Sequence, residues 1–393
     1  MDEPSRVIMS SKTSYTGLLV WFVCVLFYLY EFLLRTLLGT FQPAIMNELQ
    51  LSSFDFALLS STAYLFVYGL MQIPVGMILA KFGIKKSMLV AAIICTVATL
   101  GFSYSYNYYT AFLFRSLMGL GSSFGFICVL VAVYDWMPYK NIALYIGLSQ
   151  FMGTMGPMAA GGPLNALAQA SIITWRHLFS ILSFIGLILI LLIALFVKNN
   201  KKTDEAFVIL KRPPNLKQNM LAMMRDRQVW VIAIYCAFLY FGLEYLSENE
   251  CKNLLLTKGF SSGFSSYMIT IAWLGFAVGS PIFGYLSDKI NRRKPILFFS
   301  AISALLSLTC IIYLPVPQLG IIISFFTFGI GVGSASVGIV LMGEQFQSDK
   351  RSSGLGLNNA ISILFVSLMA PCISYLLTFI ANGSSYLCTG QFL

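Results

Sequence analysis

The sequence predicts an all-α protein that crosses a membrane many times. Of its 393 residues, 58% are hydrophobic and only 10% are charged, and the mean hydropathy is +0.81. Soluble globular chains are about 45–50% apolar and about 25% charged. Apolar runs of about 20 residues recur along the chain, and a helix needs that length to cross the hydrocarbon core of a bilayer. We therefore expect a polytopic helical protein whose surroundings are the lipid bilayer.

The apolar runs define about eleven spans. A polar segment precedes the first span without an A-x-A-like site, so we expect no cleaved signal peptide. The first half holds six spans, at 17–40, 56–80, 87–104, 109–134, 142–166 and 176–198. The second half holds five, at 228–248, 264–287, 295–314, 318–343 and 353–381.

The basic residues set the expected orientation. Of the 25 Lys and Arg residues, twenty fall in loops on one side of these spans and three on the other, while Arg35 and Arg115 lie inside spans. Such a bias is typical of a basic side that faces the cytoplasm. We therefore expect a multi-pass protein with a cytoplasmic N-terminus. Because topology accounts for the net charge of +10, we expect no nucleic-acid partner.

The chain divides into two similar halves. The basic linker 199–227 contains adjacent prolines and separates an N-terminal unit, 1–198, from a C-terminal unit, 228–393. Matches recur between the units at offsets of 208–210 residues, such as "GMILAKFGIKKSML" with "GYLSDKINRRKPIL" and "IGLSQ" with "LGLNN". This repeat predicts two six-helix-type bundles in parallel order, an arrangement known in transporters.

The motifs resemble those of the major facilitator superfamily over nearly the whole chain. The segment 76–86 and its second copy, 284–294, are similar to the family's G-x-x-x-D-R-x-G-R-K signature. Arg115 with two following glycines resembles its R-x-x-x-G-x-G pattern, and "GPMAAGG" resembles its G-P-x-x-G-G pattern. The resemblance implies a monomeric secondary transporter of a bacterial inner membrane, without enzymatic activity or cofactor, that works by alternating access. Stretches such as "YEFLLR" are similar to proteobacterial importers of the intraphagosomal amino-acid type.

The sequence departs from the family pattern at informative places. Ala80 stands where the first signature has an acid, and Asn291 replaces a glycine of the second copy. A twelfth helix is expected near residue 385, where only nine residues remain, so we expect about eleven spans without it. The resemblance implies gating roles on the basic side for a set of loop and helix-end residues: Gly76, Lys81, Gly83, Lys85, Asp135, Gly284, Asp288, Arg292 and Glu344.

Two charges in the first span raise the question of function. Glu31 and Arg35 lie one helical turn apart on one face, and insertion scales assign about 2.5–3.5 kcal/mol to each charge at the centre of a membrane helix. They could form an intrahelical pair, or their face could line a water-accessible cavity. At an offset of 209, Arg35 corresponds to Glu244 and Glu31 to Tyr240. Acid and base would then meet between the halves.

Other polar residues within spans are candidates for the same cavity. Arg115 could anchor a substrate carboxylate, or could instead be a structural partner of Glu31 or Asp135. Tyr68, Gln72 and Asn359 could line the cavity, with ordinary helix packing as the alternative. The eight cysteines form no C-x-x-C pair and the chain has one His, so we expect no metal site. No P-loop is present, so this chain should not hydrolyse ATP.

These observations predict the proton-coupled import of a small zwitterionic or anionic metabolite, with an amino acid as the first candidate. The alternatives are a siderophore or organic-anion transporter, a drug efflux pump, and a membrane scaffold or sensor that does not transport. Arg stays protonated, so a carboxylate must carry the proton. Glu31 is the first candidate for this role and Glu244 the second.

The orientation can be tested at the linker. In a variant without native cysteines, Asn215→Cys should resist membrane-impermeant thiol reagents added to intact cells, because the charge bias places this loop in the cytoplasm. Permeabilised cells provide the control, since labelling should then be complete. Rapid labelling in intact cells would show that the orientation is inverted.

Overall fold

A computed structural model describes residues 14–52, 55–56, 58–170, 172–199, 223–247 and 251–383. In the first half, the helices are α1 (Tyr15–Thr40), α2 (Gln42–Leu49), η1 (Leu58–Phe66), α4 (Val67–Ser103), α5 (Tyr108–Trp136), η2 (Tyr139–Asn141), α6 (Ile142–Gly153), α7 (Met155–Ala159), η3 (Ala160–Leu164), α8 (Asn165–Gln169) and α9 (Trp175–Phe196). In the second half, they are α12 (Arg227–Tyr245), α13 (Cys251–Thr257), α14 (Ser262–Ile290), α15 (Lys294–Tyr313), α16 (Gln318–Val332), α17 (Ala335–Glu344) and α18 (Ser348–Gly383).

All eleven predicted spans fall on helices. In the described residues, nine helical segments are long and apolar enough to cross a membrane, and α18 contains a shorter apolar helix at Ser353–Met369. The remaining span, predicted at 142–166, is built from α6, α7, η3 and α8 in series. Most of the predicted linker, and the position near 385 where a twelfth helix was expected, lie outside the described residues.

Polar side chains fix where several of these helices begin. The hydroxyl of Ser14 accepts a hydrogen bond from the Gly17 amide at α1, and Asn107 accepts one from the Thr110 amide at α5. Thr174 and Ser261 cap α9 and α14 in the same way. Such caps satisfy backbone donors that have no partner within the helix. They fix the residues at which these four helices begin.

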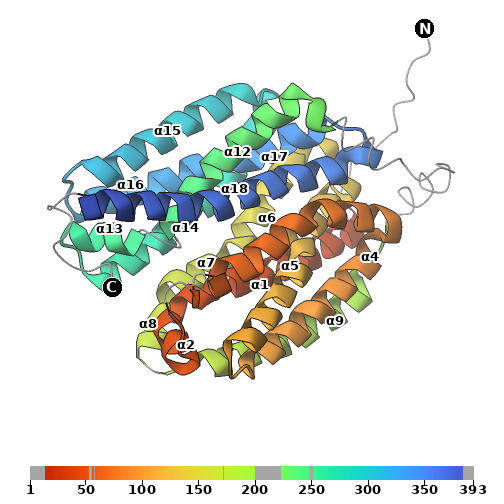
Figure 1. The fold of residues 1–393 in the computed structure, drawn as a ribbon. Helices are drawn as coiled ribbons and strands as arrows, with labels where there is room; N and C mark the ends of the chain where they lie inside the picture. Colours follow the sequence, from red (N-terminus) through yellow and green to blue (C-terminus); the bar gives the residue numbers. More distant parts are fainter. Residues whose placement is uncertain are drawn as a thin grey trace, which may run out of the picture.

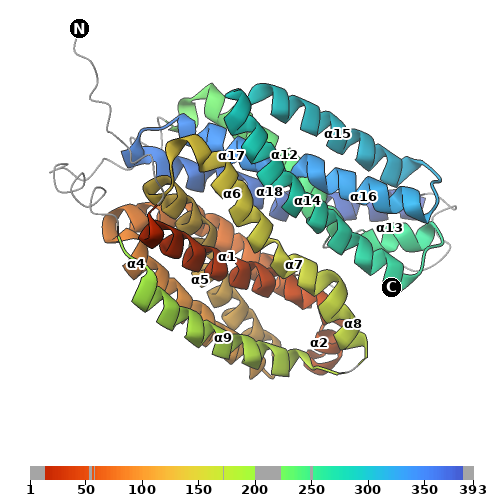
Figure 2. The ribbon, with the colours of Figure 1, turned by 180° about the vertical axis from the view of Figure 1, so that it is seen from behind.

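The helices form two bundles that lie side by side (Figures 1 and 2). One bundle holds α1 to α9, coloured red to yellow-green, and the other holds α12 to α18, coloured green to blue. Across the boundary α6 packs against α14, and α18 packs against α4. We call the end of the molecule that carries the exposed side chains of Lys81, Lys140 and Lys289 the basic end.

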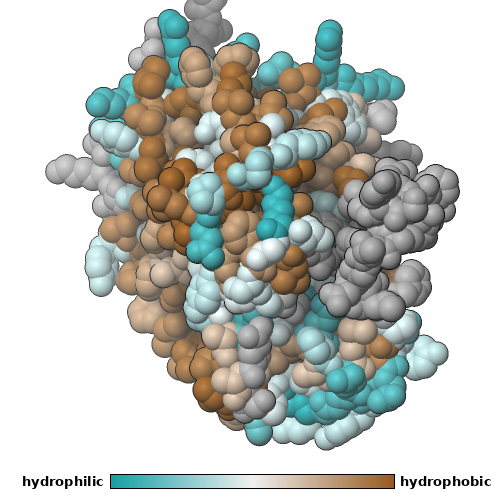
Figure 3. Space-filling view, turned by 90° about the vertical axis from the view of Figure 1, so that its left-hand side faces the viewer, coloured by the Kyte–Doolittle hydropathy of each residue, from teal (hydrophilic) through white to brown (hydrophobic). Residues whose placement is uncertain are grey.

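Central and outer helices differ in burial as expected for a membrane protein. In the most apolar stretch of α5 and of the α16–α17 segment, 78% of the residues are buried, against 39% in α9 and 33% in α15. The outer faces of α9 and α15 expose large apolar side chains, among them Phe184, Leu191, Phe299 and Leu305. Hydrophobic residues cover much of the face in Figure 3. Apolar surface of this extent needs lipid or another apolar partner.

The two signature loops at the basic end share one backbone feature. Gly83 has φ +75° in the first copy, and Asn291, its repeat counterpart, has φ +57° in the second. This left-handed region favours glycine, and among other residues Asn tolerates it best. The two turns differ in ψ, which is 168° at Gly83 and 27° at Asn291, so only Asn291 lies in the left-handed helical region that Asn tolerates.

Two equivalent glycines let the halves approach each other closely. A Cβ at Gly147 of α6 would lie 2.5 Å from the carbonyl oxygen of Ser280, and a Cβ at Gly356 of α18 would lie 2.5 Å from that of Gln72. The repeat relates both members of these pairs, at offsets of 209 and 208. Because backbone lies opposite, neither glycine can be replaced without moving the halves apart.

This packing can be tested with spin labels at the basic end. In a protein labelled at Lys140→Cys and Lys289→Cys, Gly147→Val and Gly356→Val should each lengthen the distance between the labels, because the added side chain meets backbone. Gly39→Val is the control, since nothing lies within 4 Å of a Cβ there. Unchanged distances in both interface variants would contradict the packing described here.

Candidate functional site

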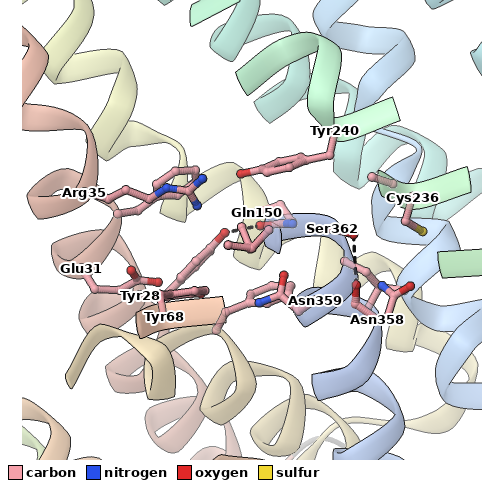
Figure 4. Close-up of a pocket in the computed structure, with 15 residues that line it drawn as sticks. Tyr28, Glu31, Arg35, Tyr68, Gln150, Cys236, Tyr240, Asn358, Asn359 and Ser362 are labelled. Carbon is pink, nitrogen blue, oxygen red and sulfur yellow. Dashed lines mark hydrogen bonds between the residues drawn. The ribbon is translucent and has the colours of Figure 1, made fainter. Parts of the chain in front are cut away.

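A small polar pocket lies between the bundles, part-way along their length. Its cavity volume is about 40 Å³, which holds on the order of three waters. Side chains from both halves line it (Figure 4): Tyr28, Glu31, Phe32, Arg35, Tyr68, Phe126, Gln150, Cys236, Tyr240, Ala335, Ile339, Asn358, Asn359, Ser362 and Ile363. A metabolite does not fit into this volume, so a substrate can enter only if the halves separate.

Arg35 and Glu244 form an ion pair between the halves. The Nη2 of Arg35 in α1 donates to the Oε1 of Glu244 in α12 over 2.7 Å, and both side chains are almost completely buried. The repeat offset predicted that acid and base would meet here, and they do. Since Arg35 lies one turn farther from the basic end than Glu31 on α1, this pair closes the pocket on the side away from that end.

Glu31 has a different partner. Its Oε2 accepts a hydrogen bond from the hydroxyl of Tyr64 over 3.2 Å, and the same hydroxyl lies 3.0 Å from the Glu31 carbonyl oxygen. Gly125 of α5 leaves room for this carboxylate, because a Cβ there would lie 2.8 Å from its Cγ. Tyr68 stacks on Tyr64 and also lines the pocket. The acid that the structure pairs with Arg35 is therefore Glu244, although Arg35 and Glu31 share a helix face.

Arg115 holds the backbone of α1 instead of facing the pocket. Its Nη1 donates to the Leu34 carbonyl and its Nη2 to the Arg35 carbonyl, each over 2.8 Å, and Tyr64 covers the guanidinium. In this conformation the main chain occupies its terminal nitrogens, and the role of Arg115 as a substrate anchor stays a prediction. Its structural partners are carbonyl groups. Arg115 thereby fixes the turn of α1 that presents Arg35.

Amide side chains connect helices on the other side of the pocket. The Nδ2 of Asn359 donates to the Oε1 of Gln72 across the halves over 2.8 Å, and Gln72 itself is buried beside the pocket lining. The hydroxyl of Tyr28 donates to the Oε1 of Gln150 over 2.6 Å within the first half. Tyr240 lines the pocket opposite Arg35 (Figure 4). Sequence reasoning did not select Tyr28, Gln150 or Asn358, although Gln150 is the repeat counterpart of Asn359.

An acid of the second signature copy connects the halves at the basic end. The Oδ2 of Asp288 accepts from the backbone amide of Leu144, at the start of α6, over 3.1 Å. Arg293 forms ion pairs with Asp288 and Glu344, each at 2.9 Å. Burial lowers the pKa of Arg293, but its hydrogen bonds to both carboxylates outweigh burial and raise it. Arg292, one of the expected gating residues, is exposed, because the turn at Asn291 directs the adjacent Arg293 toward the acids.

The first signature copy makes weaker contacts. Lys81 is exposed and lies over the ring of Phe82, and the backbone amide of Lys85 donates to Asn199. Gly83 packs against the side chain of the same Asn199. Gly284 of the second copy packs against the Ala143 carbonyl of the other half. Its counterpart in the first copy, Gly76, lies within α4. The half-buried Asp135 lies at the end of α5.

At the basic end, a tyrosine of one half packs against a glycine at the equivalent position of the other half. Tyr134 of α5 packs into the space left by Gly343 of α17, its counterpart at offset 209. The guanidinium of Arg351 lies 4.6 Å from the centre of the Tyr134 ring, and its Nε donates to the Gly343 carbonyl. Equivalent positions of the two halves therefore face each other, with a large residue on one side and glycine on the other.

The pocket is thus closed on both sides. The described residues contain no group of three or more His, Cys, Asp or Glu side chains that could hold a metal ion. Two helical bundles around a buried, charged pocket define a membrane transporter, in which substrate sites lie between repeats near the bilayer midplane.

Comparison with known proteins gives the family. A family model described as "Major Facilitator Superfamily" matches residues 20–249 and 252–390. The chain belongs to the major facilitator superfamily, and it is a secondary transporter and a multi-pass membrane protein.

Individual relatives are distant. An uncharacterised MFS-type transporter, YdgK of Bacillus subtilis, is 24% identical over 84% of this chain and 82% of that protein. A hexuronate transporter of the same organism is 22% identical over 68% of this chain and 64% of that protein. A structure of the proton:xylose symporter XylE has a TM-score of 0.72, with 16% identity over 94% of this chain and 91% of that chain. At this identity, the likeness to XylE concerns the fold.

The inequality of the two signature copies can be tested. Asp288→Asn should lower the uptake rate by about tenfold or more, because it removes an ion pair and weakens a contact between the halves. Substitutions at Ala80 should have a much smaller effect. Ala80→Asp should favour outward-facing states, as a shorter distance between labels at 140 and 289 would show. If Asp288→Asn leaves the uptake rate unchanged, Asp288 has no gating role.

Proposed function

We propose that this protein imports a small organic carboxylate together with a proton. The observation that carries the proposal is the balance of its buried charges. Among the described residues, the buried charged side chains are Arg35, Arg115, Glu31 and Glu244, exposed by 8%, 0%, 2% and 0% respectively. If both glutamates are ionised, these two basic and two acidic side chains balance each other when no substrate is bound.

An anionic substrate upsets this balance. Each uncompensated charge in a buried site costs several kcal/mol, so a monovalent carboxylate in the pocket requires a positive charge to enter with it. Neither arginine can change its protonation state, whereas either glutamate can take up a proton. One proton for each monovalent carboxylate restores neutrality. This balance of charges supports the proposal of proton symport.

Glu244 is the acid that we assign to coupling. Its Oε1 accepts a hydrogen bond from the Nη2 of Arg35. A proton on Glu244 weakens this ion pair and makes the guanidinium available to a substrate carboxylate. Bidentate pairing of Arg with a carboxylate is among the strongest hydrogen-bonded arrangements. Glu31, our first candidate from the sequence, is hydrogen-bonded to Tyr64 and becomes the second candidate. Loss of the proton on the cytoplasmic side returns Glu244 to Arg35 and releases the substrate.

The family comparison supports an anionic substrate. The hexuronate transporter of Bacillus subtilis is named for a sugar acid, and it matches this chain over 278 residues. We further propose that the protein resides in a bacterial inner membrane with its N-terminus and basic end in the cytoplasm. In that orientation the proton gradient of a respiring cell drives import.

A zwitterion such as an amino acid is the second candidate. The Oε2 of Glu244 is buried and has no hydrogen-bond partner among the described residues, so it could accept from an ammonium group while Arg35 binds the carboxylate. A zwitterion adds no net charge and therefore needs no proton for neutrality. The effect of a pH gradient separates the two candidates.

Uptake into proteoliposomes tests the coupling. A pH gradient that is acidic outside should drive the accumulation of a monovalent carboxylate, and membrane potential alone should not, because one proton accompanies each anion. Glu244→Gln should abolish accumulation but preserve substrate exchange, since a neutral residue at 244 already leaves Arg35 available. Glu31→Gln should have a smaller effect on accumulation.

Arg35 provides the matched controls. Arg35→Ala should remove binding, whereas Arg35→Lys keeps the charge without the planar fork and should retain weak binding. Full pH-driven accumulation in Glu244→Gln would exclude Glu244 as the coupling acid. Accumulation without any dependence on pH would instead favour the zwitterion.

A further inference from the structure

The side-chain oxygen of one buried amide in the pocket has no hydrogen-bond partner among the described residues. Asn358 of α18 lines the cavity and is 3% exposed. Its Oδ1 has no hydrogen-bond partner among the described residues. The nearby hydroxyl of Ser362 does not supply one, because it donates to the Asn358 backbone carbonyl over 3.0 Å. Buried polar groups are nearly always satisfied, and leaving one unsatisfied is costly.

The position of this amide within the pocket points to a ligand. The cavity of about 40 Å³ admits a few waters, and these can satisfy Asn358 while no substrate is present. A substrate that displaces such water loses affinity unless it replaces the hydrogen bond. The substrate should therefore carry a polar group where it meets Asn358.

Asn358 and Arg35 lie on different walls of the pocket. Arg35 projects from α1 in the first half, and Asn358 projects from α18 in the second, on the opposite side of the view in Figure 4. A ligand that meets both therefore has a carboxylate at one end and a second polar group at the other. Phe32, Phe126, Ile339 and Ile363 also line the pocket, and these apolar side chains suit a carbon skeleton.

We propose that Asn358 is a specificity-determining residue that binds a hydroxyl group of the substrate. This inference rests on the carboxylate transport proposed above and names the substrate class as hydroxylated carboxylic acids. A hydroxyl both donates and accepts, so it satisfies Asn358 whichever way its amide is turned. A carboxylic acid without a hydroxyl leaves the amide unsatisfied, and sites built around a hydrogen bond discriminate strongly against such analogues.

Matched acids test this assignment. Dissociation constants are measured by titration calorimetry on the purified full chain for two pairs, gluconate with hexanoate and lactate with propionate. In the unchanged protein at least one hydroxylated acid should bind about tenfold more tightly than its partner. Asn358→Leu should reduce this ratio to near one and leave the partner's affinity equal or higher. Gln42→Leu, which replaces an exposed amide side chain of α2 by leucine, should keep the ratio.

The outcomes separate this inference from the proposed function. If no acid binds, or if binding survives Arg35→Ala, the proposed carboxylate site is wrong. If acids bind in an Arg35-dependent way and the ratio is near one, or is unchanged in Asn358→Leu, only the role of Asn358 is overturned. Hexanoate and propionate binding report whether Asn358→Leu is folded. If the Asn358→Leu variant aggregates, Asn358→Ala is used instead. It should reduce the ratio of affinities for the hydroxylated and unhydroxylated acids in the same way.

Discussion

The ion pair between Arg35 and Glu244 is the constraint on which the rest of the site depends. A buried charge without a counter-charge is strongly destabilising, so the two halves cannot move apart here unless something else compensates both groups. The substrate carboxylate can replace Glu244 at the guanidinium, and a proton can neutralise Glu244. In the proposed mechanism, binding, proton uptake and release of the contact between the halves are parts of a single event.

Other parts of the fold support this pair. Arg115 uses its guanidinium to hold two carbonyl groups of α1, and so fixes the helical turn that carries Arg35. Glycines at equivalent positions in α6 and α18 let the halves meet backbone to backbone. Tyr134, Arg351 and Asp288 close the basic end.

Sequence reasoning reached the fold and the central pair because both follow from regular patterns. Hydropathy defined eleven spans, and the repeat offset placed Arg35 opposite Glu244. Sequence reasoning failed where local backbone geometry determines which groups a side chain contacts. Arg115 carries a charge within a span, but no pattern shows that backbone carbonyls surround it. Arg292 and Arg293 are adjacent, and only the left-handed turn at Asn291 determines which one meets Asp288. Tyr28 and Asn358 had no signal beyond being polar residues within apolar spans.

The repeat also explains why the closed pocket is not symmetrical. Two-fold related positions face each other at the interface, so identical large residues there would clash and identical small ones would leave a hole. Tyr134 opposite Gly343 avoids both outcomes. The same logic applies to charge: Arg35 opposite Glu244 forms a pair where two equal residues would repel. Divergence of the two halves at these positions was therefore needed before the duplicated bundles could close around a charged pocket.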